Sequence, residues 1–114
     1  PEEAQLDAED AKLITLARSA RVRNAAVEGA AVRDDTGRTY VATTVSLASL
    51  RLSAVQVAVA MAVASGASGL EAAAVVTESD AVADDDRAVV TELGPTASIF
   101  VADSRGDLRS TVAG

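Results

Sequence analysis

The chain contains no cysteine and no histidine, and Tyr40 and Phe100 are the only aromatic residues among its 114 residues. Without cysteine there is no disulfide and no thiolate metal site. The scarcity of aromatic rings disfavours a surface that stacks the bases of single-stranded nucleic acid. A formal net charge of -7 also opposes contact with phosphate backbones. These shortages exclude the commonest zinc sites and predict no nucleic-acid partner.

The residues that are abundant are small and apolar. Hydrophobic residues make up 49% of the sequence, and a chain of this length builds one core, so we expect a single domain over residues 1–114. The longest weakly charged stretch, residues 52–70, is rich in alanine and interrupted by serine and glycine, which predicts a buried helix and no membrane span. The acidic first ten residues lack the basic start of a signal peptide, so the expected location is the cytoplasm.

Hydrophobic spacing and turn residues predict alternating helices and strands. Leu13, Leu16, Ala17 and Ala20 lie on one face of a helix that Asp7 can cap and that runs to about Arg23. The further expected elements are a hairpin formed by 29–32 and 38–45, a helix over 51–65, a strand over 70–78, a helix over 85–93, and strands over 97–103 and 107–112. The order α-β-β-α-β-α-β-β predicts an α/β fold, a three-layer α/β/α sandwich with a mixed sheet.

Several strings within these elements resemble the small homo-oligomeric cytidine deaminases, and the likeness covers nearly the whole chain. GAAVRDDTGRTY is similar to the first hairpin of that family, and AVASG to the end of its zinc-site helix. AAAVV resembles the next strand, RAVVTELGP the helix after the paired cysteines, and IFVADSRGDLRSTV the final strands. The resemblance implies the cytidine-deaminase fold.

The catalytic signature of that family is absent at the corresponding positions. The resemblance places its three zinc-binding cysteines on Ser53, Ala83 and Asp86, and its proton-relaying glutamate on Val55. Its nucleoside-binding Asn-x-Glu-Asn falls on residues 44–47, including Thr44, Ser46 and Leu47. Zinc-assisted deamination needs three strong ligands and a separate carboxylate. We therefore predict no metal, no cofactor and no catalytic residue, and we expect the former site to become part of the core.

Three polar features allow a functional interpretation beside a structural one. Asp84, Asp85 and Asp86, with Glu78 or Asp80, could offer oxygen ligands to a hard cation, but capping of a helix start explains them without a metal. Ser53 could act as a nucleophile, but the chain has no histidine to serve as its base, so we interpret its hydroxyl as bonding to the backbone. Arg87 could bind an anion, although pairing with Asp84 or Asp86 is favoured.

These observations favour a catalytically inactive cytidine-deaminase-like protein that acts through an oligomeric surface or an unidentified protein partner. The alternatives are a nucleoside- or nucleotide-binding module and a hydrolase with rebuilt chemistry; the label of cytidine deaminase would rest on the resemblance alone. We expect a homo-dimer or homo-tetramer, as the resemblance also implies. The interface is predicted on the helix over 51–65, where small side chains let two helices approach closely. Its expected residues are Ala54, Ala58, Met61 and Ala62.

Overall fold

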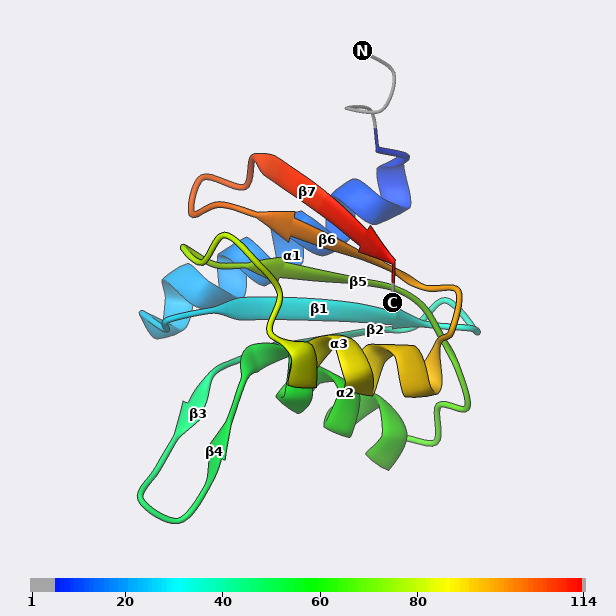
Figure 1. Cartoon of the computed structure of the whole chain (residues 1–114), viewed down its shortest axis with the longest axis horizontal. Helices are drawn as coiled ribbons and strands as arrows, with labels where there is room; N and C mark the ends of the chain where they lie inside the picture. The colour runs from blue at the N-terminus through cyan, green and yellow to red at the C-terminus, as the bar shows by residue number, and fades with distance from the viewer. Residues whose placement is uncertain (1–5, 114) are drawn as a thin grey trace.

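A five-stranded mixed sheet lies at the centre of the structure, a computed structural model that describes residues 6–113 (Figure 1). The strand order is β2-β1-β5-β6-β7. Strands β5 and β6 run parallel, and the other neighbouring pairs of this sheet are antiparallel. The strands are β1 (Gly29–Asp34), β2 (Thr39–Thr43), β5 (Leu70–Val76), β6 (Ser98–Ala102) and β7 (Leu108–Ala113).

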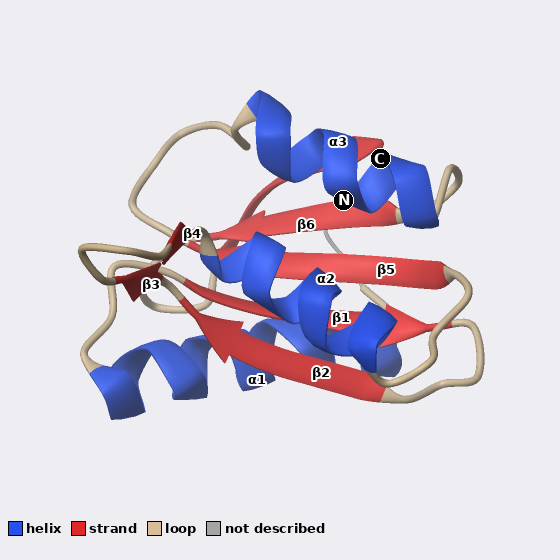
Figure 2. Cartoon of the chain, turned by 90° about the horizontal axis from the view of Figure 1, so that it is seen from below, coloured by secondary structure: helices blue, strands red, loops and turns tan. Residues whose placement is uncertain are grey.

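Helices cover both faces of this sheet. Helix α1 (Ala8–Asn24) lies on one face, and α2 (Ala54–Ala64) and α3 (Asp84–Leu93) lie on the other (Figure 2). The predicted three-layer α/β/α sandwich with a mixed sheet is therefore confirmed. The structure adds a small ribbon, formed by β3 (Val45–Ser46) and β4 (Arg51–Leu52), which projects beside α2 (Figure 1). Two residues per strand are too few to give a periodic hydrophobic signal, so the sequence did not predict it.

Helix α1 begins and ends where local chemistry favours it. The Asp7 carboxylate accepts a hydrogen bond from the backbone N–H of Asp10 at 2.9 Å, as predicted for the cap. Acidic residues occupy the first turn and arginines the last, which suits the helix dipole. The helix stops at Ala25, whose φ of 50° is left-handed. Its buried face consists of Leu13, Ile14, Ala17 and Ala20.

Small side chains bring α1 very close to the sheet. A Cβ atom added at Gly29 would lie 2.1 Å from the carbonyl oxygen of Ala17, so this position on β1 requires glycine. The apolar core on this face also contains Ala31, Ala74 and Phe100.

Within the described residues, no helix is long and apolar enough to cross a membrane.

Helix α2 packs on the opposite face, against β1 and β2. Ala54, Ala58 and Ala62 have an exposed fraction of 0% within the single chain. A side chain that is fully covered within one chain offers no surface of its own to a second copy, so this burial disfavours the three alanines as contact residues, and an interface on this helix stays a prediction. They face the sheet because small side chains let the helix approach its backbone. Met61, the fourth predicted residue, is 41% exposed.

Asp34, at the end of β1, organises the turn to β2. Its Oδ1 accepts hydrogen bonds from Thr36 N at 2.9 Å, Thr36 Oγ1 at 2.7 Å and Arg38 N at 3.0 Å, and its Oδ2 accepts one from the Tyr40 hydroxyl at 3.1 Å. Burial alone would raise the pKa of this carboxyl, but the hydrogen bonds from Thr36, Arg38 and Tyr40 outweigh it and hold the pKa below its ordinary value. Ionised Asp34 therefore favours the folded hairpin.

This arrangement predicts a pH-dependent contribution to stability. Because the folded-state pKa is lowered, the contribution is present above the unfolded pKa of about 3.9 and is lost as the pH falls through the folded pKa. We expect Asp34→Asn to lower the urea midpoint at neutral pH, and the difference from the parent to shrink in acid. Asp35→Asn, at the exposed neighbouring position, is the control. A difference independent of pH would contradict this role of Asp34.

Candidate functional site

The start of α2 is fixed by a reciprocal pair of hydrogen bonds. Ser53 Oγ accepts a bond from Gln56 N at 3.1 Å, and Gln56 Oε1 accepts one from Ser53 N at 2.9 Å. This capping box satisfies two backbone donors that the helix itself leaves free. The interpretation of the Ser53 hydroxyl as a partner of the backbone is thus confirmed. The same hydroxyl also donates a hydrogen bond to Asp86 Oδ1 at 2.6 Å.

Three aspartates occupy the first turn of α3, and they differ in their surroundings. Asp84 and Asp85 are exposed, whereas Asp86 is 7% exposed. Negative charge at this end of a helix is favoured by its dipole. The residue at the capping position is Ala83, and no side chain there bonds to the helix backbone. The run therefore fits the dipole, but the expected hydrogen-bonded cap is not formed, because the aspartates begin one residue too late.

Arg87 does not pair with these aspartates as predicted. Its Nε donates to the carbonyl oxygen of Ala113 at 3.1 Å, and no ion pair joins it to Asp84 or Asp86 among the described residues. The bond ties α3 to the end of the edge strand β7. Arg87 is accordingly a link between two elements, and within residues 6–113 no lysine or arginine forms an ion pair with Asp86.

A second polar pair lies close to the first and was missed in the sequence. Thr77 Oγ1, just after β5, donates to Glu28 Oε2, just before β1, at 2.8 Å. Thr77 is 4% exposed and also accepts a bond from Ser79 N at 3.1 Å. Glu28 N donates to Thr44 Oγ1 at 3.2 Å. Polar residues that directly flank apolar strands were the available signal, but nothing local shows that Glu28 and Thr77 meet.

The two polar pairs line one cavity of about 280 Å³. It lies where the start of α2, the start of α3, the start of β1 and the end of β5 come together. The structure thus brings Ser53, Ala83 and Asp86 to one cavity, as their resemblance to a ligand set implies. Its lining is formed by Glu28, Ser53, Gln56, Val75, Thr77, Ser79, Ala81, Val82, Ala83, Asp85 and Asp86.

These residues do not fit a catalytic zinc ion. Zinc prefers thiolate and imidazole ligands, and the chain has neither. Ser53 Oγ is a hydroxyl engaged with Asp86, and the Ala83 side chain has no donor atom. Val55, at the position of the proton-relaying glutamate, is 0% exposed and belongs to the core beneath the sheet. The prediction that the former site becomes core therefore holds for Val55, but Ser53 is half-buried and Ala83 is exposed.

The positions resembling a nucleoside-binding stretch lie apart from this cavity. Thr44 does not line the cavity, but its Oγ1 accepts a hydrogen bond from the backbone N–H of Glu28, which does. Ser46 and Leu47 lie on the β3–β4 ribbon, where Leu47 is 57% exposed. None of these three residues lines the cavity. The ribbon accordingly carries no group that is placed to hold a nucleoside there.

The acidic residues considered for a hard cation are dispersed. Asp80 pairs with Arg109 of β7, and Glu78 and Asp84 are exposed. Within residues 6–113, no three carboxylate side chains come together in a group that could hold a metal ion. The geometry therefore does not support the cation site that was considered for the aspartates at 84–86.

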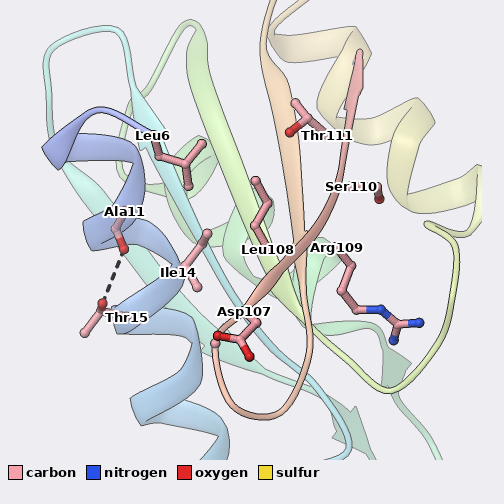
Figure 3. A pocket seen from close by; sticks show the side chains of 10 residues that line it. Leu6, Ala11, Ile14, Thr15, Asp107, Leu108, Arg109, Ser110 and Thr111 are labelled. Carbon is pink, nitrogen blue, oxygen red and sulfur yellow. Dashed lines mark hydrogen bonds between the residues drawn. The ribbon is translucent and has the colours of Figure 1, made fainter. Parts of the chain in front are cut away.

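A larger hollow of about 800 Å³ lies on the other face of the sheet, between α1 and β7. Figure 3 shows Leu6, Ile14 and Leu108 on its walls. The hydroxyl of Thr15 on its helical wall is occupied by a bond to the carbonyl oxygen of Ala11 at 3.3 Å (Figure 3). None of the site residues predicted from the sequence lines this hollow, so it is separate from the candidate site.

The fold and this cavity define a class of protein, the three-layer α/β/α proteins with a polar site at the starts of two adjacent helices. The family model described as cytidine deaminase-like matches residues 6–106. This chain belongs to the cytidine deaminase-like family. A comparison with curated protein sequences gives no match.

Solved structures of cytidine deaminases are similar to this chain in fold. The cytidine deaminase from Burkholderia pseudomallei aligns with a TM-score of 0.78 and 28% identity over 90% of each chain. The cytidine deaminase from Mycobacterium tuberculosis aligns with a TM-score of 0.68 and 25% identity, over 83% of this chain and 85% of that one. For the enzyme from Mycobacterium leprae the TM-score is 0.69 and the identity 21%, over 85% and 89%, which concerns the fold alone.

The burial of Val55 gives a direct test of how the site has changed. Val55→Glu places an unpaired carboxylate in the core, and we expect the free energy of unfolding to fall by about 2–4 kcal/mol. Urea unfolding followed by circular dichroism measures the change. Val27→Glu, at a valine that is 73% exposed, is the matched control and should be nearly neutral. Equal stability of Val55→Glu and the parent would show that position 55 meets water.

Proposed function

We propose that this chain is a cytidine-deaminase-like protein that performs no zinc-dependent deamination and acts as a homo-oligomeric or partner-binding protein. The observation that carries the proposal is the hydrogen bond from Ser53 Oγ to Asp86 Oδ1. It joins two positions that the family resemblance assigns to zinc ligands. With Val55 in the core and no cysteine or histidine in the chain, neither the ligand set nor the proton relay of the family's chemistry is available.

The surface proposed for assembly is the outer face of α2, formed by Val57, Ala60, Met61 and Ala64. Ala60 and Ala64 are exposed, Met61 is 41% exposed, and Val57 is half-buried. Residues 52–70 carry no charge, in a chain that is 24% charged overall. Acidic copies of one chain repel each other least where charge is absent, and small side chains permit close helix packing. The proposed surface therefore consists of outward-facing residues of α2 and does not include the buried Ala54, Ala58 and Ala62.

A ligand-binding module is the second candidate function. The cavity between α2 and α3 supports it, because it is enclosed by elements from both halves of the chain and contains several polar side chains. A nucleotide is disfavoured as its ligand, since Glu28, Asp85 and Asp86 would repel phosphate groups.

The absence of zinc chemistry is tested on the purified chain. We expect elemental analysis to find no stoichiometric zinc, and chromatography to find no conversion of cytidine or deoxycytidine to the uridine form. The cytidine deaminase from Burkholderia pseudomallei serves as the positive control in the same assay. One zinc per chain, or product above the protein-free blank, would disprove the proposal.

Assembly through the outer face of α2 is tested by sedimentation equilibrium. We expect the parent to have the mass of a dimer or a tetramer at micromolar concentration, and Ala60→Glu to be a folded monomer, because symmetry brings the new charges together. Ser19→Glu, on the exposed side of α1, adds the same charge elsewhere and should assemble like the parent. A monomeric parent would refute assembly, and an unchanged Ala60→Glu oligomer would refute this surface.

A further inference from the structure

The cavity between α2 and α3 presents hydrogen-bond acceptors without a positively charged side chain. Carboxylates of Glu28, Asp85 and Asp86 line it, together with the hydroxyls of Ser53 and Thr77. No lysine or arginine belongs to its lining, and Arg87 is held at Ala113 on β7. The electrostatics of such a cavity disfavour anions and favour a cation.

Asp86 is the most deeply buried carboxylate in the lining of this cavity. It is 7% exposed, and its Oδ1 accepts the hydrogen bond from Ser53. Among residues 6–113, no hydrogen bond reaches its Oδ2 and no lysine or arginine pairs with its charge. Oδ2 is not among the buried atoms that lack a hydrogen-bond partner, so this oxygen is accessible from the cavity. Asp86 therefore presents an open carboxylate oxygen on the wall of the cavity, with no cationic side chain beside it.

Glu28 contributes a second carboxylate from a different part of the chain. Its Oε2 is bonded to Thr77 Oγ1 at 2.8 Å, which fixes the side chain at the cavity. Thr77 is in turn 4% exposed and bonded to Ser79 N, so this wall is held in place. Two anchored carboxylates on one cavity suit a ligand with several N–H donors.

The volume of the cavity and its apolar walls favour an organic cation over a bare metal ion. A cavity of about 280 Å³ corresponds to roughly nine water volumes, which is far larger than a bare metal ion. Although three carboxylates line the cavity, no three acidic side chains of the described residues are grouped so that they could hold a metal ion. Val75, Val82 and Ala81 form an apolar part of the wall. A ligand with a short carbon chain and a charged nitrogen matches both the carboxylates and the apolar part of the wall.

We infer that this cavity binds a small organic amine in its protonated form. The ammonium group donates to Asp86 and Glu28, and the carbon chain packs against Val75 and Val82. The inference shares with the proposed function the premise that zinc does not fill this cavity. Binding of an amine requires neither assembly nor the outer face of α2, so the two proposals fail separately.

The experiment is a titration of the ¹⁵N-labelled full chain with n-butylamine at neutral pH and constant ionic strength, followed by NMR. We expect saturable shifts of the backbone amides of Ser53, Thr77 and Asp86 at millimolar ligand. n-Butanol has the same carbon chain without charge and should produce no saturable shift. Absence of a saturable shift with n-butylamine, or an equal response to n-butanol, would overturn the inference.

Matched variants locate the binding. Asp86→Asn keeps an acceptor for Ser53 but removes the charge, and we expect it to weaken n-butylamine binding by roughly tenfold or more. Glu28→Gln should weaken it as well. Asp84→Asn removes a carboxylate from the same turn of α3 but outside the cavity, and should bind like the parent. Equal binding by Asp86→Asn and Asp84→Asn would refute the site. Saturable shifts with Mg²⁺ but not with n-butylamine would identify a metal site and also refute the amine.

Discussion

Close packing of α2 on the sheet sets the geometry of the neighbouring parts of the molecule. Ala54, Ala58 and Ala62 are fully buried against a sheet whose own residues are largely alanine and valine. Larger side chains on this stripe would push the helix outward or strain the core, because protein interiors are densely packed. The depth at which α2 lies fixes the position of Ser53 at its start. The polar cavity therefore follows from the packing of alanines.

The same packing bears on the proposal that this chain performs no zinc-dependent deamination. Ser53 caps α2 and donates to Asp86, so it links the starts of two helices by hydrogen bonds. Val55 adds apolar surface to the core where a relay carboxylate would need a metal and a substrate as partners. Val55 therefore belongs to the hydrophobic core, while the cavity next to it is lined by polar side chains.

Charge is distributed unevenly over the molecule, and this separates two kinds of surface. The outer face of α2 is free of charge although the chain carries a net charge of -7. The cavity at the start of the same helix collects carboxylates, with Asp86 buried and Glu28 held by Thr77. An uncharged surface favours contact with a like copy, whereas an anionic cavity favours a small cation. The two surfaces share α2 but present different chemistry.

Local signals in the sequence determined most of the elements. Asp7 identified the start of α1, and the spacing of Leu13, Ala17 and Ala20 identified its buried face. The turn around Asp34 identified the first hairpin. Each of these depends on residues within a few positions of one another, where backbone geometry alone decides what meets. The resemblance grouped Ser53, Ala83 and Asp86 as one set of positions, and the structure brings these three to one cavity.

The tertiary structure decided what local spacing leaves undetermined. Alanine recurs so often in α2 that several stripes are equally smooth, and only the position of β1 and β2 selects the inward one. Ser53 and Asp86 are 33 residues apart, and Glu28 and Thr77 are 49 apart. These pairs meet because β1 and β5 are neighbours in the sheet and α2 and α3 lie on the same face. Local sequence signals fixed the three helices and the five strands of the main sheet, because these depend on neighbouring residues, whereas the order of the strands in the sheet fixed which polar side chains share a cavity.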